Sequence, residues 1–145
     1  MGAVRVEHSE LIAADPQACF DAITDFDTYP QWQSAVRECR VLSRDGQKGT
    51  LVETVIDAKV RKVRYVLRYH AEPPHRLWWD YVEGDVKSIA GGYDFDDAGD
   101  GATRATYRVA IDPGRMVPGP VRRLLAGPVT RTSVRELRQR VESLS

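Results

Sequence analysis

The sequence has no long apolar run, little cysteine and no excess of charge of either sign. No segment approaches the roughly 18 consecutive apolar residues that a membrane-spanning helix needs, and no basic stretch followed by an apolar run stands at the amino terminus. These absences predict a cytoplasmic protein with no membrane-spanning segment. The 21 basic residues are balanced by 21 acidic ones, which argues against a dedicated nucleic-acid-binding protein.

Cysteine is too sparse to suggest a disulfide framework or a metal site. Cys19 and Cys39 have no metal-type spacing and lie among apolar neighbours, so we expect buried free thiols. The aspartates of residues 94–100 do not form a calcium loop, because Ala98 and Gly99 stand where ligands would be needed. No glycine-rich phosphate loop or zinc-protease motif is present, and we expect neither a metal nor a cofactor.

The length and the composition fit one domain covering residues 1–145. A chain of 145 residues with 42% hydrophobic and 29% charged residues falls in the range of a single globular domain. Residues 4–12 mix apolar and polar positions at short spacing, which predicts a first strand that runs into a helix.

Two short helices are expected after this strand. Asp15 is a good N-cap and Pro16 suits the first helical position. In the stretch "TDFDTYPQW" (residues 24–32), Asp27 or Thr28 is expected to cap the second helix, with Pro30 in its first turn. We interpret this stretch as scaffold, in which Tyr29 and Trp32 pack the helix down.

Residues 36–112 have the pattern of β-strands. β-branched and aromatic residues alternate with charged ones between clear turn signals, which predicts strands at 36–44, 50–58, 62–72, 76–83, 86–96 and 102–112. The links are too short for crossover helices, so neighbouring strands should pair antiparallel. In the strand 62–72 one face should be buried, formed by Val63, Tyr65, Leu67, Tyr69 and Ala71.

The last third of the chain is expected to supply a helix that covers this sheet. Val134, Leu137, Val141 and Leu144 form an apolar helical stripe, and an earlier turn around Val121, Leu124 and Leu125 ends where Gly127-Pro128 breaks or kinks the helix. The fold class is therefore α+β: a curved antiparallel sheet wrapped around one long carboxy-terminal helix, with two short helices after the first strand.

This order of elements resembles the helix-grip fold of the START-like (SRPBCC) superfamily, which includes polyketide cyclase/dehydrases and coenzyme Q-binding proteins. Three stretches carry the resemblance: Ala14-Asp15-Pro16 leading into Phe20; "DFDTYPQW", like the family's D-x-x-x-Y-P-x-W; and "VEGDVKSIAGGYDF" at residues 82–95. Together with the order of elements, the resemblance covers nearly the whole chain.

The resemblance implies a hydrophobic cavity between the sheet and the long helix, with the short helices near one end, where Trp32 is expected to help close the pocket. The residues expected to line it and to bind a ligand are Tyr65, Leu67, Tyr69, Trp79, Tyr81, Tyr93, Tyr107, Leu124 and Leu125. Five of these are tyrosines, whereas a filled core would mostly use leucine, isoleucine and valine. Apolar pockets with a few polar groups are typical of small-molecule sites, so this set favours a pocket.

No catalytic residue can be assigned from the sequence. His70 is expected on the outer face of its strand, His75 lies in a turn, and Glu53, Asp57 and Asp80 should point to water. The leading hypothesis is binding or transport of a lipid, isoprenoid quinone or polyketide. The alternatives are a polyketide aromatase/cyclase or dehydratase, which could act through a shaped cavity, and a protein-binding regulator.

Charge is distributed unevenly along the chain. Residues 115–145 hold seven arginines and two glutamates, a net charge of +5, whereas residues 85–101 hold five aspartates and Lys87, a net charge of −4. Such runs usually keep a surface hydrated. The alternative is that the arginine-rich helix makes transient contact with an anionic membrane surface or a partner protein.

Overall fold

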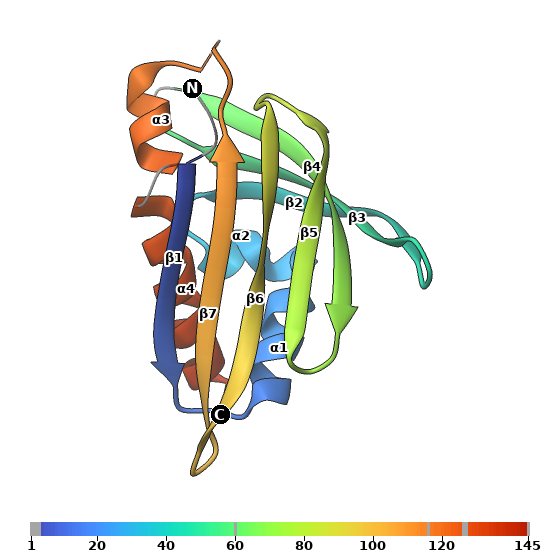
Figure 1. The fold of residues 1–145 in the computed structure, drawn as a ribbon, viewed down its shortest axis with the longest axis vertical. Helices are drawn as coiled ribbons and strands as arrows, with labels where there is room; N and C mark the ends of the chain where they lie inside the picture. Colours follow the sequence, from blue (N-terminus) through green and yellow to red (C-terminus); the bar gives the residue numbers. More distant parts are fainter. Residues whose placement is uncertain (1–3, 60, 116, 126–127, 145) are drawn as a thin grey trace.

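A seven-stranded antiparallel sheet dominates the computed structural model, which describes residues 4–59, 61–115, 117–125 and 128–144. The strands lie in the order β1-β7-β6-β5-β4-β3-β2 (Figure 1). Their bounds are β1 (Val4–Ile12), β2 (Val36–Asp45), β3 (Gly49–Asp57), β4 (Lys62–Glu72), β5 (Arg76–Gly84), β6 (Ser88–Gly99) and β7 (Ala102–Asp112). The predicted strands are therefore confirmed, with ends that agree to within three residues.

The helices gather on one face of this sheet. The short elements α1 (Pro16–Thr24), η1 (Phe26–Thr28) and α2 (Tyr29–Trp32) follow β1, and α3 (Gly119–Leu125) and α4 (Pro128–Ser143) follow β7. Figure 1 shows α4 behind β1 and β7. This is the predicted helix-grip arrangement. Of the predicted break, Gly127 lies outside the described residues, and α4 begins at Pro128.

The apolar stripe of α4 fixes this helix against the sheet. Val134, Leu137 and Val141 are almost completely buried, as their helical spacing predicts. Leu144 was expected to continue the stripe, but 64% of its surface is exposed. The prediction was wrong at this position because α4 ends at Ser143, so Leu144 lies one residue beyond the helix.

Polar contacts hold α4 over β1 as well. Arg138 donates to Glu10 on β1 at 3.1 Å, and Glu142 accepts from the backbone N–H of Ala13 at 2.9 Å. Glu10 also lies 2.6 Å from Nε2 of His8. Arg138 is thus already engaged within the fold, and contact of the arginine-rich helix with a membrane or a partner stays a prediction for the remaining arginines.

The two short helices begin in different ways. Asp15 caps α1 as predicted, because its carboxylate accepts from the N–H of Ala18 at 2.9 Å. Thr28 precedes α2 but makes no side-chain cap, and Asp27 lies within η1, so neither residue caps α2 as expected. Its hydroxyl donates to the carbonyl of Asp25 at 2.7 Å and accepts from Nε1 of Trp32 at 3.1 Å.

A pair of glycines lets β6 approach its neighbours closely. Gly91 and Gly92 stand where the β5–β6 pairing stops, since β5 pairs with β6 only between Arg76–Trp79 and Gly91–Asp94. A Cβ atom on Gly91 would lie 2.2 Å from the carbonyl oxygen of Arg108. That atom belongs to the backbone of β7, so only a shift of the strand could make room for a side chain.

Gly91→Ala is therefore expected to lower the free energy of unfolding by about 1–3 kcal/mol, the usual cost of overpacking. Gly46→Ala is the matched control, because nothing lies within 4 Å of a Cβ atom at that position, and it should stay within about 0.5 kcal/mol of the parent. Urea denaturation measures both values. Equal losses of unfolding free energy in the two variants would show that the close approach of β7 to Gly91 does not cause the destabilisation.

Candidate functional site

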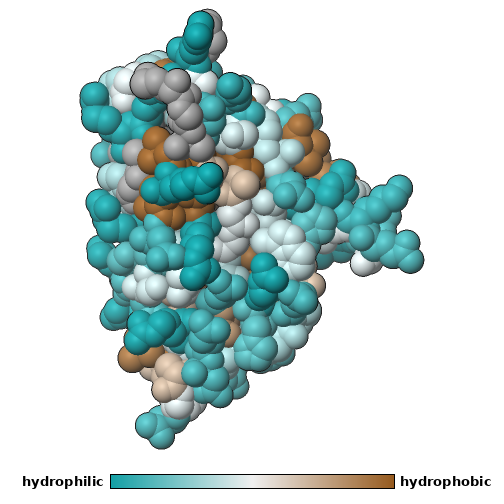
Figure 2. All heavy atoms as spheres, in the orientation of Figure 1, coloured by the Kyte–Doolittle hydropathy of each residue, from teal (hydrophilic) through white to brown (hydrophobic). Residues whose placement is uncertain are grey.

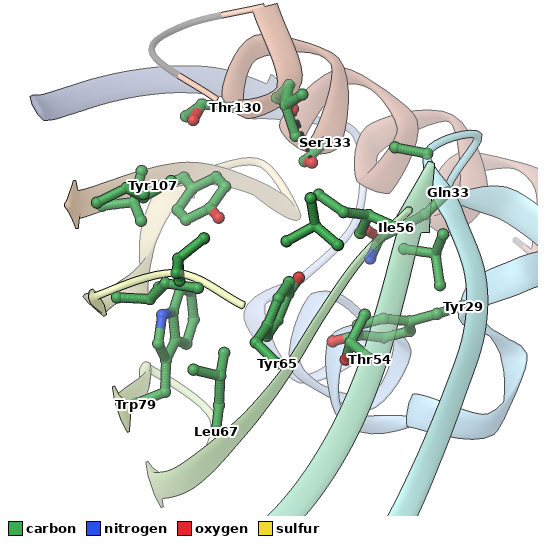
Figure 3. Close-up of a pocket in the computed structure, with 18 of the residues that line it drawn as sticks. Tyr29, Gln33, Thr54, Ile56, Tyr65, Leu67, Trp79, Tyr107, Thr130 and Ser133 are labelled. Carbon is green, nitrogen blue, oxygen red and sulfur yellow. Dashed lines mark hydrogen bonds between the residues drawn. The ribbon is translucent and has the colours of Figure 1, made fainter. Parts of the chain in front are cut away.

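A cavity of about 90 Å³ lies between the inner face of the sheet and the first turns of α4 (Figure 3). Its walls come from α1, α2 and its following turn, strands β2 to β7, the β5–β6 turn and α4. The cavity therefore lies where the resemblance implies one.

Most of the predicted residues line this cavity. They are Tyr65, Leu67, Tyr69, Trp79, Tyr93 and Tyr107. Tyr81 does not line it. It lies toward the end of β5, and its hydroxyl donates to the carbonyl of Val86 in the β5–β6 turn at 2.6 Å. Leu124 and Leu125 belong to α3, but their side chains lie outside the described part of the structure.

The cavity also has polar lining residues that were not predicted. They are Tyr29, Gln33, Thr54, Thr130 and Ser133. Thr54 could have been found, because it alternates with Val52 and Ile56 on the more apolar side of β3. Thr130 likewise extends the stripe of Val134 by one helical turn. Gln33 gave no signal in the sequence, and Trp32, which was expected to close the pocket, is not among the lining residues.

Aromatic rings form one wall of the cavity. The Trp79 ring centroid lies 5.4 Å from that of Tyr69 and 5.7 Å from that of Tyr107. The rings of Tyr93 and Tyr107 stack at 4.6 Å. Such contacts fix the orientation of each ring. The Trp79 ring is tilted by 52° to Tyr69 and by 66° to Tyr107, so the wall presents both ring faces and ring edges to the cavity.

Several hydrogen-bond donors in this wall have no partner among the described residues. The Nε1 atom of Trp79 is buried and makes no hydrogen bond. The hydroxyls of four tyrosines form none with any described residue either: Tyr65, Tyr69, Tyr93 and Tyr107. Tyr29 differs, because its hydroxyl donates to the carbonyl of Ile23. The four tyrosine hydroxyls thus give a mainly apolar cavity hydrogen-bond donors for a guest with acceptor atoms.

Burial keeps these tyrosines neutral. Removal from water disfavours the phenolate and raises the pKa of Tyr65, Tyr69, Tyr93 and Tyr107 above the usual value. Neighbouring tyrosines add to the effect for Tyr65, Tyr69 and Tyr93. At neutral pH the hydroxyls therefore act as donors, and none is a ready proton acceptor of the kind a general base must be.

Charged side chains lie outside the cavity. None of its described lining residues is Asp, Glu, His, Lys or Arg. Glu53 projects from the other face of β3 and is held by Arg40 and Arg64, each at 2.7 Å, and His70 meets Asp80 at 3.1 Å. No group of three or more His, Cys, Asp or Glu side chains that could hold a metal ion occurs in the described ranges.

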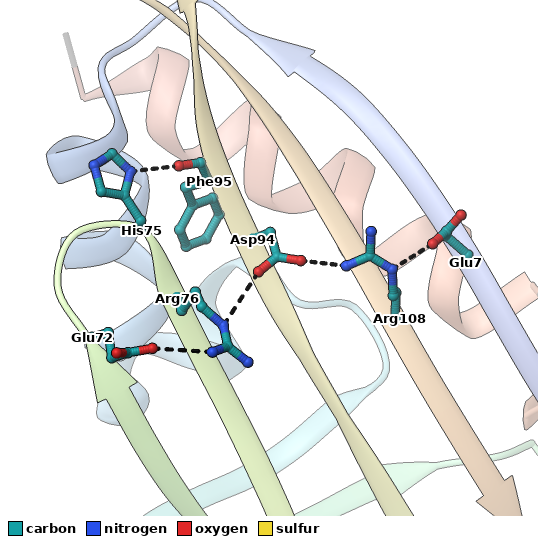
Figure 4. Close-up of polar contacts among 7 residues, drawn as sticks. All are labelled: Glu7, Glu72, His75, Arg76, Asp94, Phe95 and Arg108. Atoms are coloured by element: carbon teal, nitrogen blue, oxygen red, sulfur yellow. Dashed lines mark hydrogen bonds and ion pairs between the residues drawn. The ribbon is translucent and has the colours of Figure 1, made fainter.

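The ionic groups instead cross the outer face of the sheet. Arg108 contacts Glu7 and Asp94, and Arg76 contacts Asp94 and Glu72, so one network spans β1, β7, β6, β5 and β4 (Figure 4). Figure 2 shows this face as mostly hydrophilic. The apolar wall of the cavity faces inward, away from this hydrophilic surface.

No helix in the described residues is long and apolar enough to cross a membrane.

The curved sheet, the covering helix and the enclosed aromatic cavity define a START-like helix-grip protein. The chain belongs to the family described as "Polyketide cyclase / dehydrase and lipid transport", whose model matches residues 3–144. No curated protein sequence gives a significant match.

Solved structures share the fold at low sequence identity. A START superfamily protein from Mycobacterium smegmatis has a TM-score of 0.85 at 19% identity, over 99% of this chain and 100% of its own. A protein from Thermus thermophilus gives 0.86 at 21% identity, over 97% and 99%. The ZhuI aromatase/cyclase from a Streptomyces species gives 0.80 at 14% identity, over 97% and 94%.

Proposed function

We propose that this protein binds or carries an apolar small molecule that bears an oxygen acceptor, such as a lipid, an isoprenoid quinone or a polyketide. The observation that carries the proposal is the buried Nε1 of Trp79, which has no hydrogen-bond partner among the described residues of the cavity wall. A buried donor without a partner costs about 1–3 kcal/mol. A carbonyl or ether oxygen of a ligand that reached this atom would remove that cost.

The family and the size of the cavity support the same proposal. Members are described as polyketide cyclases, dehydrases and lipid-transport proteins, activities that all involve apolar molecules. A volume of about 90 Å³ is below the roughly 300–1,000 Å³ of typical ligand pockets. The cavity therefore suits one ring or a short branch of a ligand, and the rest of the molecule must extend beyond it.

Binding is favoured over acid–base catalysis by the chemistry of the wall. A cyclase or dehydratase must move protons, and general acid–base groups work best when their pKa lies near the operating pH. The described lining offers tyrosines whose pKa is raised and no charged side chain. If the protein also promotes cyclisation, the cavity would act by folding the substrate and donating hydrogen bonds to its carbonyls.

Trp79→Phe is expected to weaken binding of a ketone without weakening binding of the matching hydrocarbon. Acetophenone and ethylbenzene share one ring and differ by a carbonyl. Loss of the indole N–H should reduce the affinity ratio of ketone to hydrocarbon about five-fold, since one hydrogen bond contributes about 1 kcal/mol. The ratio is measured by NMR titration and is insensitive to the volume lost from the ring.

Trp78→Phe is the matched control. Trp78 neighbours Trp79 on β5 but stacks against His70 and Arg76 and is absent from the cavity wall, so the ratio should not change. Native mass spectrometry of freshly purified protein provides an independent test. Failure of both probes to bind the parent protein, together with no co-purified molecule, would overturn the proposed function.

A further inference from the structure

A surface groove of about 370 Å³ adjoins the cavity. Four residues line both spaces: Gln33 and Ala35 from the α2–β2 connection, and Val129 and Ser133 from α4. Figure 3 shows Gln33 and Ser133 at the edge of the cavity. The two spaces therefore adjoin at these four residues, which is where a ligand long enough to occupy both spaces would cross.

The groove is charged where the cavity is not. Its described charged residues are Arg37, Asp57, Lys59 and Glu136. Arg37 is paired with Asp57 at 3.0 Å, and both carboxylate oxygens of Glu136 accept from the backbone N–H of Ser34, at 3.1 and 3.2 Å. Lys59 forms no ion pair with a described residue. Its ammonium is thus the groove cation that has no carboxylate partner within the described part of the chain.

The position of Lys59 is set by its neighbours. The backbone has a φ of 71° at this residue, a left-handed conformation that residues other than glycine and asparagine seldom adopt. The Asp57 carboxylate holds it there by accepting from the Lys59 N–H at 2.8 Å. The groove is also bordered by Pro128 and Val129 at the start of α4. The helix dipole adds positive potential at this end of α4, and the first turn has no acidic residue that would offset it.

We infer that this groove is a second chamber, which receives the anionic end of a ligand whose apolar end occupies the cavity, and that Lys59 contacts the anion. The inference rests on the proposed function. It narrows the ligand class to amphipathic molecules with a carboxylate or similar anion at one end. It also accounts for the size of the cavity, which holds only part of a typical ligand.

Matched amphipathic probes test this inference. Phenylalkanoates of increasing chain length place one ring in the cavity and carry a carboxylate toward the groove, and the corresponding phenylalkanols lack the charge. For the parent protein the acid should bind about three- to five-fold more tightly than the alcohol of equal length, as expected for a partly exposed ion pair. The preference should peak at one chain length and shrink as the salt concentration rises.

Lys59→Gln should abolish this preference for the acid and leave the affinity of the alcohols unchanged. Lys59→Asn provides a second variant, because asparagine tolerates the left-handed backbone. The matched control is Lys48→Gln, which removes an exposed cation from the β2–β3 turn, outside both spaces. It should keep the full preference.

The outcomes separate the two proposals. If the alcohols bind in the cavity but the acids show no preference, or if the Lys59 variants keep the preference, the second chamber is wrong and the proposed function stands. If neither series perturbs the NMR signals of Trp79 and Tyr107, the second chamber is wrong, and the proposed function fails as well when no molecule co-purifies with the protein. Loss of the acid preference in both Lys59 variants and not in the Lys48 variant supports the inference.

Discussion

Raising the pH above about 10 is expected to unfold the protein within a narrow range. Five tyrosines around the cavity have a raised pKa because burial disfavours the phenolate: Tyr29, Tyr65, Tyr69, Tyr93 and Tyr107. Burial likewise raises the pKa of the Cys19 and Cys39 thiols to about 11. All these groups can ionise more easily in the unfolded chain, where their pKa values are ordinary.

The sign of the effect follows from proton linkage. Each of these groups is neutral when protonated and has a higher pKa in the folded protein than in the unfolded chain. The free energy of unfolding therefore does not change with pH below the unfolded pKa, and it decreases as the pH rises above that value. The decline should begin near pH ~9 with the thiols and steepen near pH ~10 with the tyrosines. Each group contributes about 1.4 kcal/mol per pH unit, so several together exceed a typical stability of about 5–15 kcal/mol within about one to two pH units.

Tyrosinate absorbance and circular dichroism, followed together, measure this transition. The two signals should change at the same pH, because the buried tyrosines ionise only when the chain unfolds. Tyr93→Phe should make the loss of stability shallower by about 1.4 kcal/mol per pH unit. Ionisation of the five tyrosines near pH ~10 in a chain that remained folded would contradict the expected burial.

Phe95→Ala is expected to destabilise the fold by about 3–5 kcal/mol. Phe95 on β6 has no exposed surface and stacks on Tyr93 at 5.5 Å. Removing the ring loses its transfer free energy and leaves a void that a close-packed sheet and helix layer cannot fill. At about 2–4 °C per kcal/mol for a chain of this size, the melting temperature should fall by about 6–20 °C.

Leu42→Ala is the control for this variant. Leu42 lies on β2 with 46% of its surface exposed, and the same kind of truncation there should change the free energy of unfolding by less than about 1 kcal/mol. Calorimetry and urea denaturation give both values. A loss at Phe95 no larger than that at Leu42 would show that the inner layer repacks around the missing ring.

The short-range features of the fold could be predicted because each depends on neighbouring residues. Asp15 and Pro16 start α1. The alternation of β4 placed Val63, Leu67 and Tyr69 on its buried face, but Ala71 near the end of the strand is exposed and Val66 of the opposite face is buried. The spacing of Val134, Leu137 and Val141 fixes the side of α4 that faces the sheet. Six of the nine predicted site residues line the cavity, and all six lie on strands β4 to β7, where alternation along the strand was the basis of the prediction.

The predictions were wrong where the position of a residue along a helix or strand matters more than the pattern of apolar and polar residues in that element. Tyr81 obeys the alternation of β5, but it stands near the end of the strand and binds Val86 in the next turn instead of lining the cavity. The Thr28 hydroxyl turns back to Asp25 and not toward α2. Gln33 lies in a connection with no periodicity, and only the packing of α4 beside it makes it part of the wall.

The sequence by itself determined the order of the strands and helices, their apolar faces and the family to which the chain belongs. The tertiary structure alone decided the volume of the cavity, the absence of a partner for Trp79 Nε1 among the described residues, and the position of Lys59 in the groove beside the cavity. The physical reason is one of range. Hydrogen-bond propensity and hydrophobic periodicity act between residues a few positions apart, whereas a cavity depends on the curvature of a whole sheet and on the placement of a helix far away in sequence.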